Sequence, residues 1–138
     1  MRALAVAILV AGCGADEATP DAIPLEPTFA SIRANILQPR CALPCHSDIE
    51  PPAGLDMETD PYAALVNVPA AGQMCEASGL DRIEPGDPAA SLLYLKITAK
   101  RDDVDPVCGE GMPQGARPSL SDQEIAVIEQ WILAGAPP

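Results

Sequence analysis

The stretch Cys41-Ala42-Leu43-Pro44-Cys45-His46 is the chemical centre of this 138-residue chain. It places two thiols beside the only histidine in the sequence. Thiols and imidazoles bind metals and form covalent links to bound groups, and closely spaced sets of them mark such sites. The fold around this stretch therefore has to present three reactive side chains together.

A c-type haem attachment site uses this set of groups. Two cysteines add across the haem vinyl groups, and the adjoining histidine ligates the iron. The usual spacing is Cys-x-x-Cys-His, whereas three residues lie between Cys41 and Cys45. The extra residue has to bulge if both sulfurs are to reach the ring. The hexapeptide predicts haem attachment through Cys41 and Cys45, with His46 as an iron ligand.

Two other interpretations use the same side chains. In one, Cys41 and Cys45 are ordinary disulfide cysteines and His46 is a neighbouring surface residue. In the other, these three residues and a fourth ligand such as Cys108 bind zinc. The second interpretation needs free thiolates, which an oxidising compartment disfavours.

The N-terminus predicts export and lipidation. Arg2 precedes an apolar run, Ala3 to Val10, which is too short to span a bilayer. The run ends in Val10-Ala11-Gly12-Cys13, which resembles a bacterial lipobox. Residues 1–12 are therefore expected to be a lipoprotein signal peptide. Cys13 would then be lipidated and would hold the protein on a membrane of the bacterial envelope, periplasmic or facing the outer membrane.

The next segment and the charge of the chain restrict its partners. Residues 13–27 are acidic, contain prolines and show no hydrophobic period, so they are expected to form a flexible tether. Without residues 1–12 the chain has seven cations against 20 acids, a net charge of −13. Such a chain repels phosphates, which excludes nucleic acid as a partner. A partner with a basic docking surface fits this charge.

The cysteine count favours cross-linking. Apart from Cys13, four cysteines are present, an even number in a small exported domain. Either all four are paired, or Cys41 and Cys45 carry haem while Cys75 and Cys108 form one bridge. Both connectivities agree with the sequence.

Hydrophobic periodicity and capping residues predict an all-α fold of about four helices with long loops. We expect no strands, because no segment alternates between apolar and polar residues. The expected helices run from Thr28 to Leu37, ending before Pro39; from Asp60-Pro61 through Val66; from Pro88, capped by Asp87, to about Lys100; and from the capping box Ser121-Asp122-Gln123-Glu124 to about Leu133.

The order of these parts resembles a single-haem class I cytochrome c and the cytochrome-c-like domains of bacterial exported lipoproteins. The resemblance covers residues 28–138 as one cytochrome c-like domain. Its parts are the amphipathic helix leading to Cys41…Cys45-His46, the Pro85-Gly86-Asp87-Pro88 turn into the middle helix, the Gly111-Met112-Pro113 segment, and the last helix ending Trp131-Ile132-Leu133-Ala134-Gly135-Ala136.

The resemblance implies haem c held by Cys41 and Cys45, with His46 as the proximal and Met112 as the distal iron ligand. Met57 and Met74 are weaker candidates for the distal position. It also implies a membrane-anchored electron carrier, not an enzyme, that exchanges electrons with redox proteins of the envelope.

Further expectations concern the packing and the remaining cysteines. In the resembling family the first and last helices cross, and Phe29 and Trp131 match the residues at that crossing. Cys75 and Cys108 have no counterpart in the minimal pattern, so their simplest interpretation is a disulfide between the central loop and the Met112 loop. The alternative function is a disulfide-stabilised lipoprotein interaction module that keeps this fold without haem.

Overall fold

A computed structural model describes residues 24–138 of the chain. The predicted signal peptide, Cys13 and the predicted tether up to residue 23 lie outside this range, so these assignments stay predictions. No helix within the described range is both long and apolar enough to cross a bilayer.

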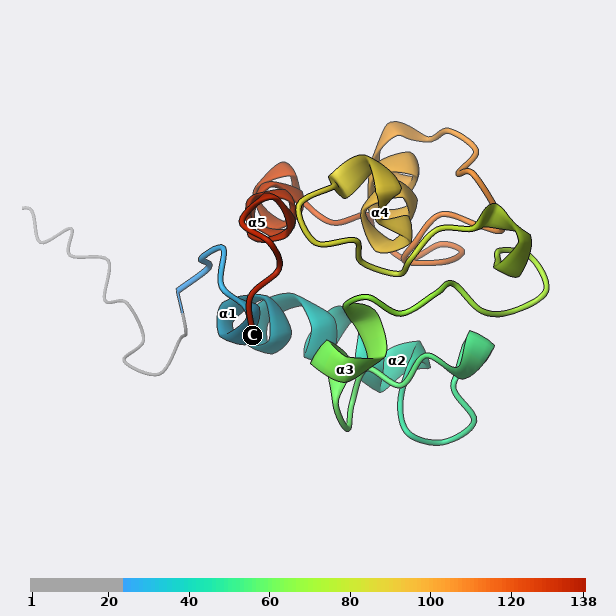
Figure 1. Cartoon of the computed structure of the whole chain (residues 1–138), viewed down its shortest axis with the longest axis horizontal. Helices are drawn as coiled ribbons and strands as arrows, with labels where there is room; N and C mark the ends of the chain where they lie inside the picture. The colour runs from blue at the N-terminus through green and yellow to red at the C-terminus, as the bar shows by residue number, and fades with distance from the viewer. Residues whose placement is uncertain (1–23) are drawn as a thin grey trace, which may run out of the picture.

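The first helix is longer than its sequence predicts. It comprises α1 (Phe29–Ile32), the π-helical segment η1 (Arg33–Ala42) and α2 (Leu43–Cys45), which follow one another without a break (Figure 1). Thr28 caps the N-terminus by accepting a hydrogen bond from the Ser31 amide at 3.3 Å.

The predicted helix end before Pro39 is wrong, because Pro39 lies inside η1. A proline in an α-helix lacks the amide donor and its ring clashes with the carbonyl four residues earlier. In η1 the hydrogen bonds reach five residues back, as from the Leu43 amide to the Gln38 carbonyl. The wider turn accommodates the proline ring, and the helix continues through both cysteines.

Three further helices confirm the predicted number, with one corrected start. Helix α3 (Pro61–Leu65) begins where predicted, and the Asp60 carboxylate accepts from the Ala63 amide at 3.1 Å. Helix α5 (Asp122–Leu133) opens with the predicted capping box. The short 3₁₀ turns η2 (Pro52–Gly54) and η3 (Glu76–Ser78) lie in loops.

The predicted helix from Pro88 to Lys100 is two elements. Asp87 caps only a 3₁₀ turn, η4 (Pro88–Ala90), and α4 (Leu92–Asp102) begins after Ser91. Ser91 has extended backbone angles, and its buried hydroxyl donates to the Asp87 carbonyl at 2.8 Å. The hydrogen bonds of the Ser91 side chain compete with helix formation at this position and separate the two elements.

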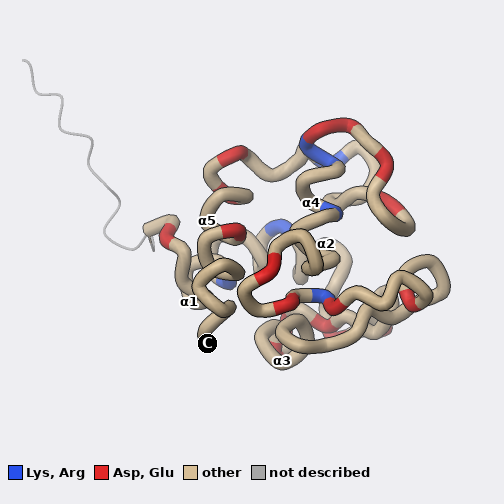
Figure 2. Tube along the Cα trace, turned by 45° about the horizontal axis from the view of Figure 1, so that its top comes forward, with Lys and Arg blue, Asp and Glu red and all other residues tan. Residues whose placement is uncertain are grey.

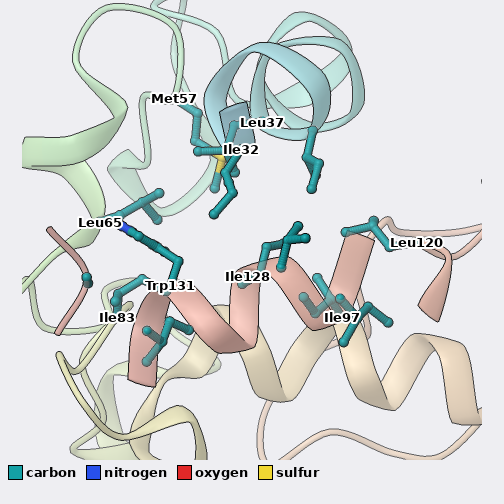
Figure 3. Close-up of a cluster of buried hydrophobic side chains, with 14 of the residues drawn as sticks. Ile32, Leu37, Met57, Leu65, Ile83, Ile97, Leu120, Ile128 and Trp131 are labelled. Atoms are coloured by element: carbon teal, nitrogen blue, oxygen red, sulfur yellow. The ribbon is translucent and has the colours of Figure 1, made fainter. Parts of the chain in front are cut away.

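The fold of residues 24–138 is all-α, with four helices, long loops and isolated bridges in place of strands. The first and last helices meet at one side of the molecule, and α4 packs beside α5 (Figure 1). Phe29 and Trp131 make the predicted aromatic contact, with ring centroids 5.6 Å apart. The buried side chains around Trp131 come from α1, η1, α3, α4, α5 and the loops (Figure 3).

Candidate functional site

A cavity of about 620 Å³ lies between the first helix, α4 and three loops. Its walls include Ile36 and Leu37 from η1 and Leu93 and Ile97 from α4. The loops around residues 46–57, 70–75 and 109–117 complete it. Ligand sites in proteins are typically pockets of about 300–1,000 Å³ with a mainly apolar lining. The cavity therefore has the size and the walls of a site for a bulky apolar ligand.

The cavity brings together the four residues that the sequence predicts as cofactor ligands. Cys41, Cys45, His46 and Met112 all line it. The first three come from the end of the first helix, and Met112 comes from the loop between α4 and α5. Cys41, Cys45 and His46 are close in the sequence and would lie close together in any fold. The informative observation is that Met112, from a distant part of the chain, lines the same cavity.

Cys41 and Cys45 are free thiols in the structure, so the small disulfide loop between them is not formed. They are four residues apart on one helix, a spacing that places both side chains on the same face. Cys41 is partly buried and Cys45 is exposed. Burial raises the pKa of Cys41 to about 11, although the neighbouring Arg40 charge lowers it. The Cys41 thiol is therefore protonated at neutral pH.

His46 is held by three hydrogen bonds. Its backbone amide donates to the Cys41 carbonyl at 3.0 Å, and its own carbonyl accepts from the Met57 amide at 2.8 Å. Nδ1 lies 3.2 Å from the Leu55 carbonyl oxygen, which can only accept, so Nδ1 carries the proton. Burial lowers the pKa of the imidazole. The neutral ring thus keeps a lone pair on Nε2, the form in which histidine binds metals.

The Met112 loop is bound to α4 at several points. The Met112 amide donates to the Lys96 carbonyl at 3.0 Å. Lys96 Nζ donates back to the carbonyls of Cys108 and Glu110, at 2.8 and 2.9 Å. Gly111 is close enough to the helix that an added Cβ would lie 3.1 Å from the Lys100 backbone nitrogen. Helix α4 therefore positions Met112 at the cavity wall.

The two competing methionines also line the cavity, in different surroundings. Met57 is 4% exposed and belongs to the main core cluster, and its amide is bonded to His46. Met74 is 72% exposed. Met112 is partly buried against the core. Met57 is thus tied to the same segment as His46, and Met74 is mostly in solvent.

The disulfide expected between Cys75 and Cys108 is present, with Cα atoms 5.3 Å apart. It joins the 70–75 loop to the segment that leads to Met112, and both border the cavity. The bridge also removes Cys108 as a possible zinc ligand. Within residues 24–138, no three His, Cys, Asp or Glu side chains form a group that could hold a metal ion.

Sequence reasoning missed the charged part of the lining. Arg40, Arg82, Lys96 and Arg117 reach the cavity from separate parts of the chain. Arg82 lies in a loop before α4 and belongs to no recognisable sequence motif. The sequence therefore does not predict that its side chain is buried. Only the fold reveals that it is 9% exposed.

Comparisons with protein-family models, with curated proteins and with solved structures find no match to this chain.

Proposed function

We propose that the chain is a single-haem c-type cytochrome that transfers electrons at the cell envelope. One observation carries the proposal: Cys41, Cys45, His46 and Met112 line a single cavity. The cavity is large and mainly apolar, and it contains two free thiols, a neutral imidazole and a thioether. These are the groups that hold a haem c with His/Met ligation. On this proposal the all-α fold is cytochrome c-like over residues 28–138.

Each residue has a separate role in the proposed site. Cys41 and Cys45 would form the two thioether links, His46 would ligate the iron through Nε2, and Met112 would bind on the distal side. Haem iron, when bound, supplies a one-electron redox couple whose potential rises with His/Met ligation. The Leu55 carbonyl would orient the His46 ring through Nδ1. The protein would act as a carrier and not as an enzyme.

The proposed location is the bacterial envelope, with the protein anchored through lipidated Cys13. The Cys75–Cys108 disulfide supports an oxidising compartment. Acidic residues are spread over the loops around the molecule, whereas cations are few (Figure 2). The proposed partners are therefore redox proteins with basic docking surfaces.

An absorption spectrum tests the proposal directly. The full chain is made in a bacterium with c-type maturation machinery, exported, lipidated and purified, and spectra are recorded before and after dithionite reduction. We expect sharp reduced bands, and a pyridine haemochrome that stays on the polypeptide after acid–acetone extraction.

Matched variants sharpen the result. Cys41→Ala with Cys45→Ala should abolish covalent haem, whereas the exposed Met74→Ala should retain it. A featureless visible spectrum in mature, lipidated wild-type protein would contradict the proposal. The disulfide-stabilised interaction module without haem would then be the remaining function to pursue.

A further inference from the structure

The cavity lining contains more cations than acids although the chain is acidic. The sequence has a net charge of −12. Among the described residues, the lining nevertheless contains four cations, Arg40, Arg82, Lys96 and Arg117, against one acid, Glu110. A cavity that concentrates the few cations of an anionic protein raises the local potential and favours an anionic group in its ligand.

The other three cations are each paired with an acid or more exposed than Arg82. Arg40 Nη1 forms an ion pair with Glu124 Oε1 at 2.9 Å. Lys96 is only partly buried and is bonded to two carbonyls of the Met112 loop. Arg117 is exposed, so solvent screens its charge. Arg82 differs from all three, because its charge is buried.

Arg82 has hydrogen-bond partners but no counterion. Nη1 donates to the Ala64 carbonyl at 2.8 Å, and Nη2 donates to the Ala53 carbonyl at 2.9 Å. In residues 24–138 the ion pairs involve only Arg40 and Arg101 as cations. A buried charge without an opposite charge is costly, whereas a guanidinium with free donors binds carboxylates well. The site is therefore built for an anion.

Arg82 and His46 line the same cavity. The Ala53 carbonyl belongs to the loop that follows His46 in the sequence, and the Ala64 carbonyl belongs to α3. These two hydrogen bonds fix the Arg82 charge in place at the cavity wall.

We propose that Arg82 binds a carboxylate of the molecule in the cavity, which under the proposed function is a propionate of haem. The inference rests on that function and adds a residue far from the cysteine–histidine motif. It assigns to the cavity a ligand with a large apolar body and at least one carboxylate. Arg82 would contact this group directly, with the Ala53 and Ala64 carbonyls as its supports.

The wild-type protein gives the first test. Haem labelled with ¹³C at the propionate carboxyls is incorporated during growth, and the carboxyl resonances are followed by NMR as the pH is varied. An adjacent guanidinium lowers a carboxyl pKa by roughly 1–3 units. We expect one propionate to titrate that far below the other. Two propionates that both titrate as ordinary exposed carboxyls would overturn the inference.

Matched variants give the second test. Arg82→Gln removes the charge while keeping an amide donor for the carbonyls. The low propionate pKa should then rise, roughly a tenfold or greater gain in proton affinity. Arg101→Gln makes the same charge change at an exposed position outside the cavity lining and should leave the propionate pKa unchanged. Arg82→Lys should restore part of the effect, since it keeps the charge without the planar fork.

The outcomes separate the two claims. If haem is bound covalently but the propionate pKa shifts no more in Arg82→Gln than in Arg101→Gln, the Arg82 site is overturned and the electron carrier is left intact. A chain that acquires no haem overturns the proposed function, and the inference falls with it. If Arg82→Gln does not fold, the wild-type titration and Arg82→Lys decide the question.

Discussion

The Nδ1 atom of His46 lies 3.2 Å from the carbonyl oxygen of Leu55, nine residues later in the chain. This contact fixes the protonated nitrogen of the ring and leaves a lone pair on Nε2 of a residue that lines the cavity. The backbone also pairs His46 with Met57, so the intervening loop folds back on the histidine. The loop therefore acts as a support for the ring.

Under the proposed function, replacing Met112 with histidine should lower the reduction potential of the bound haem. His/Met ligation gives a higher potential than bis-histidine ligation, because the thioether favours ferrous iron. Potentiometric titration of Met112→His checks this expectation. Met74→His is the control, since Met74 lines the same cavity but is 72% exposed, and its potential should equal that of the wild type. A lowered potential in Met74→His with none in Met112→His would identify Met74 as the ligand.

Deletion of Leu43 should preserve covalent haem while restoring the usual two-residue spacing. Leu43 is 68% exposed, so its loss removes little core packing. The His46 amide now bonds five residues back, to the Cys41 carbonyl, and the deletion turns this π-type bond into an α-type bond. We expect full haem incorporation and a free energy of unfolding within roughly 1 kcal/mol of wild type. Haem content per polypeptide and urea unfolding measure both quantities.

A one-residue insertion after Leu43 is the opposite change. It places Cys41 and Cys45 five residues apart, so their side chains leave the common helix face. Covalent haem should fall below that of the wild type. Normal haem content in this variant would show that the helix register between the cysteines does not matter.

Trp131→Ala should be among the most destabilising substitutions in the chain. Trp131 is 1% exposed, packs against Phe29, and donates from Nε1 to the Pro137 carbonyl at 2.8 Å. Truncating a buried aromatic residue costs about 3–5 kcal/mol. Denaturant unfolding should show this loss, whereas Leu133→Ala, at 58% exposure, should change stability by about 0.5 kcal/mol or less. Equal effects of the two substitutions would contradict the packing described above.

Replacing Cys75 and Cys108 with serine should reduce the free energy of unfolding by about 2–4 kcal/mol. The bridge closes a separation of 33 residues and restricts the unfolded chain. It also connects two cavity walls, so we expect distal ligation by Met112 to be lost at a lower denaturant concentration than in the wild type. Parallel unfolding curves from far-UV circular dichroism and from haem absorbance measure the two effects. Coincident, unshifted curves in the double variant would show that the bridge does not stabilise the site.

The sequence predicts the parts of the fold that local chemistry determines. Asp60 with Pro61, and Ser121 with Glu124, cap their helices as expected because these signals act over a few residues. The helix through Pro39 could not be predicted, since standard rules end a helix before proline and the π turn that accommodates it has no sequence signature.

The residues of the candidate site divide in the same way, into those that the sequence predicts and those that only the fold brings together. The residues near Cys41 and the position of Met112 follow from the motif and the resemblance, and the structure brings them to one cavity. The burial of Arg82 depends on how distant loops pack, so its contacts with Ala53 and Ala64 emerge only in three dimensions. Long-range burial of a charged residue is set by tertiary structure and not by local propensity.

The attachment of the Met112 loop to α4 has a consequence for rates. Backbone and lysine hydrogen bonds and a disulfide hold this loop, so its atoms have little freedom to shift when the charge of a neighbouring group changes. An electron carrier built in this way would have a small nuclear reorganisation energy. Its speed would then be governed by how closely a partner approaches, and the anchored loop would let the protein exchange electrons with several partners without rearranging for each.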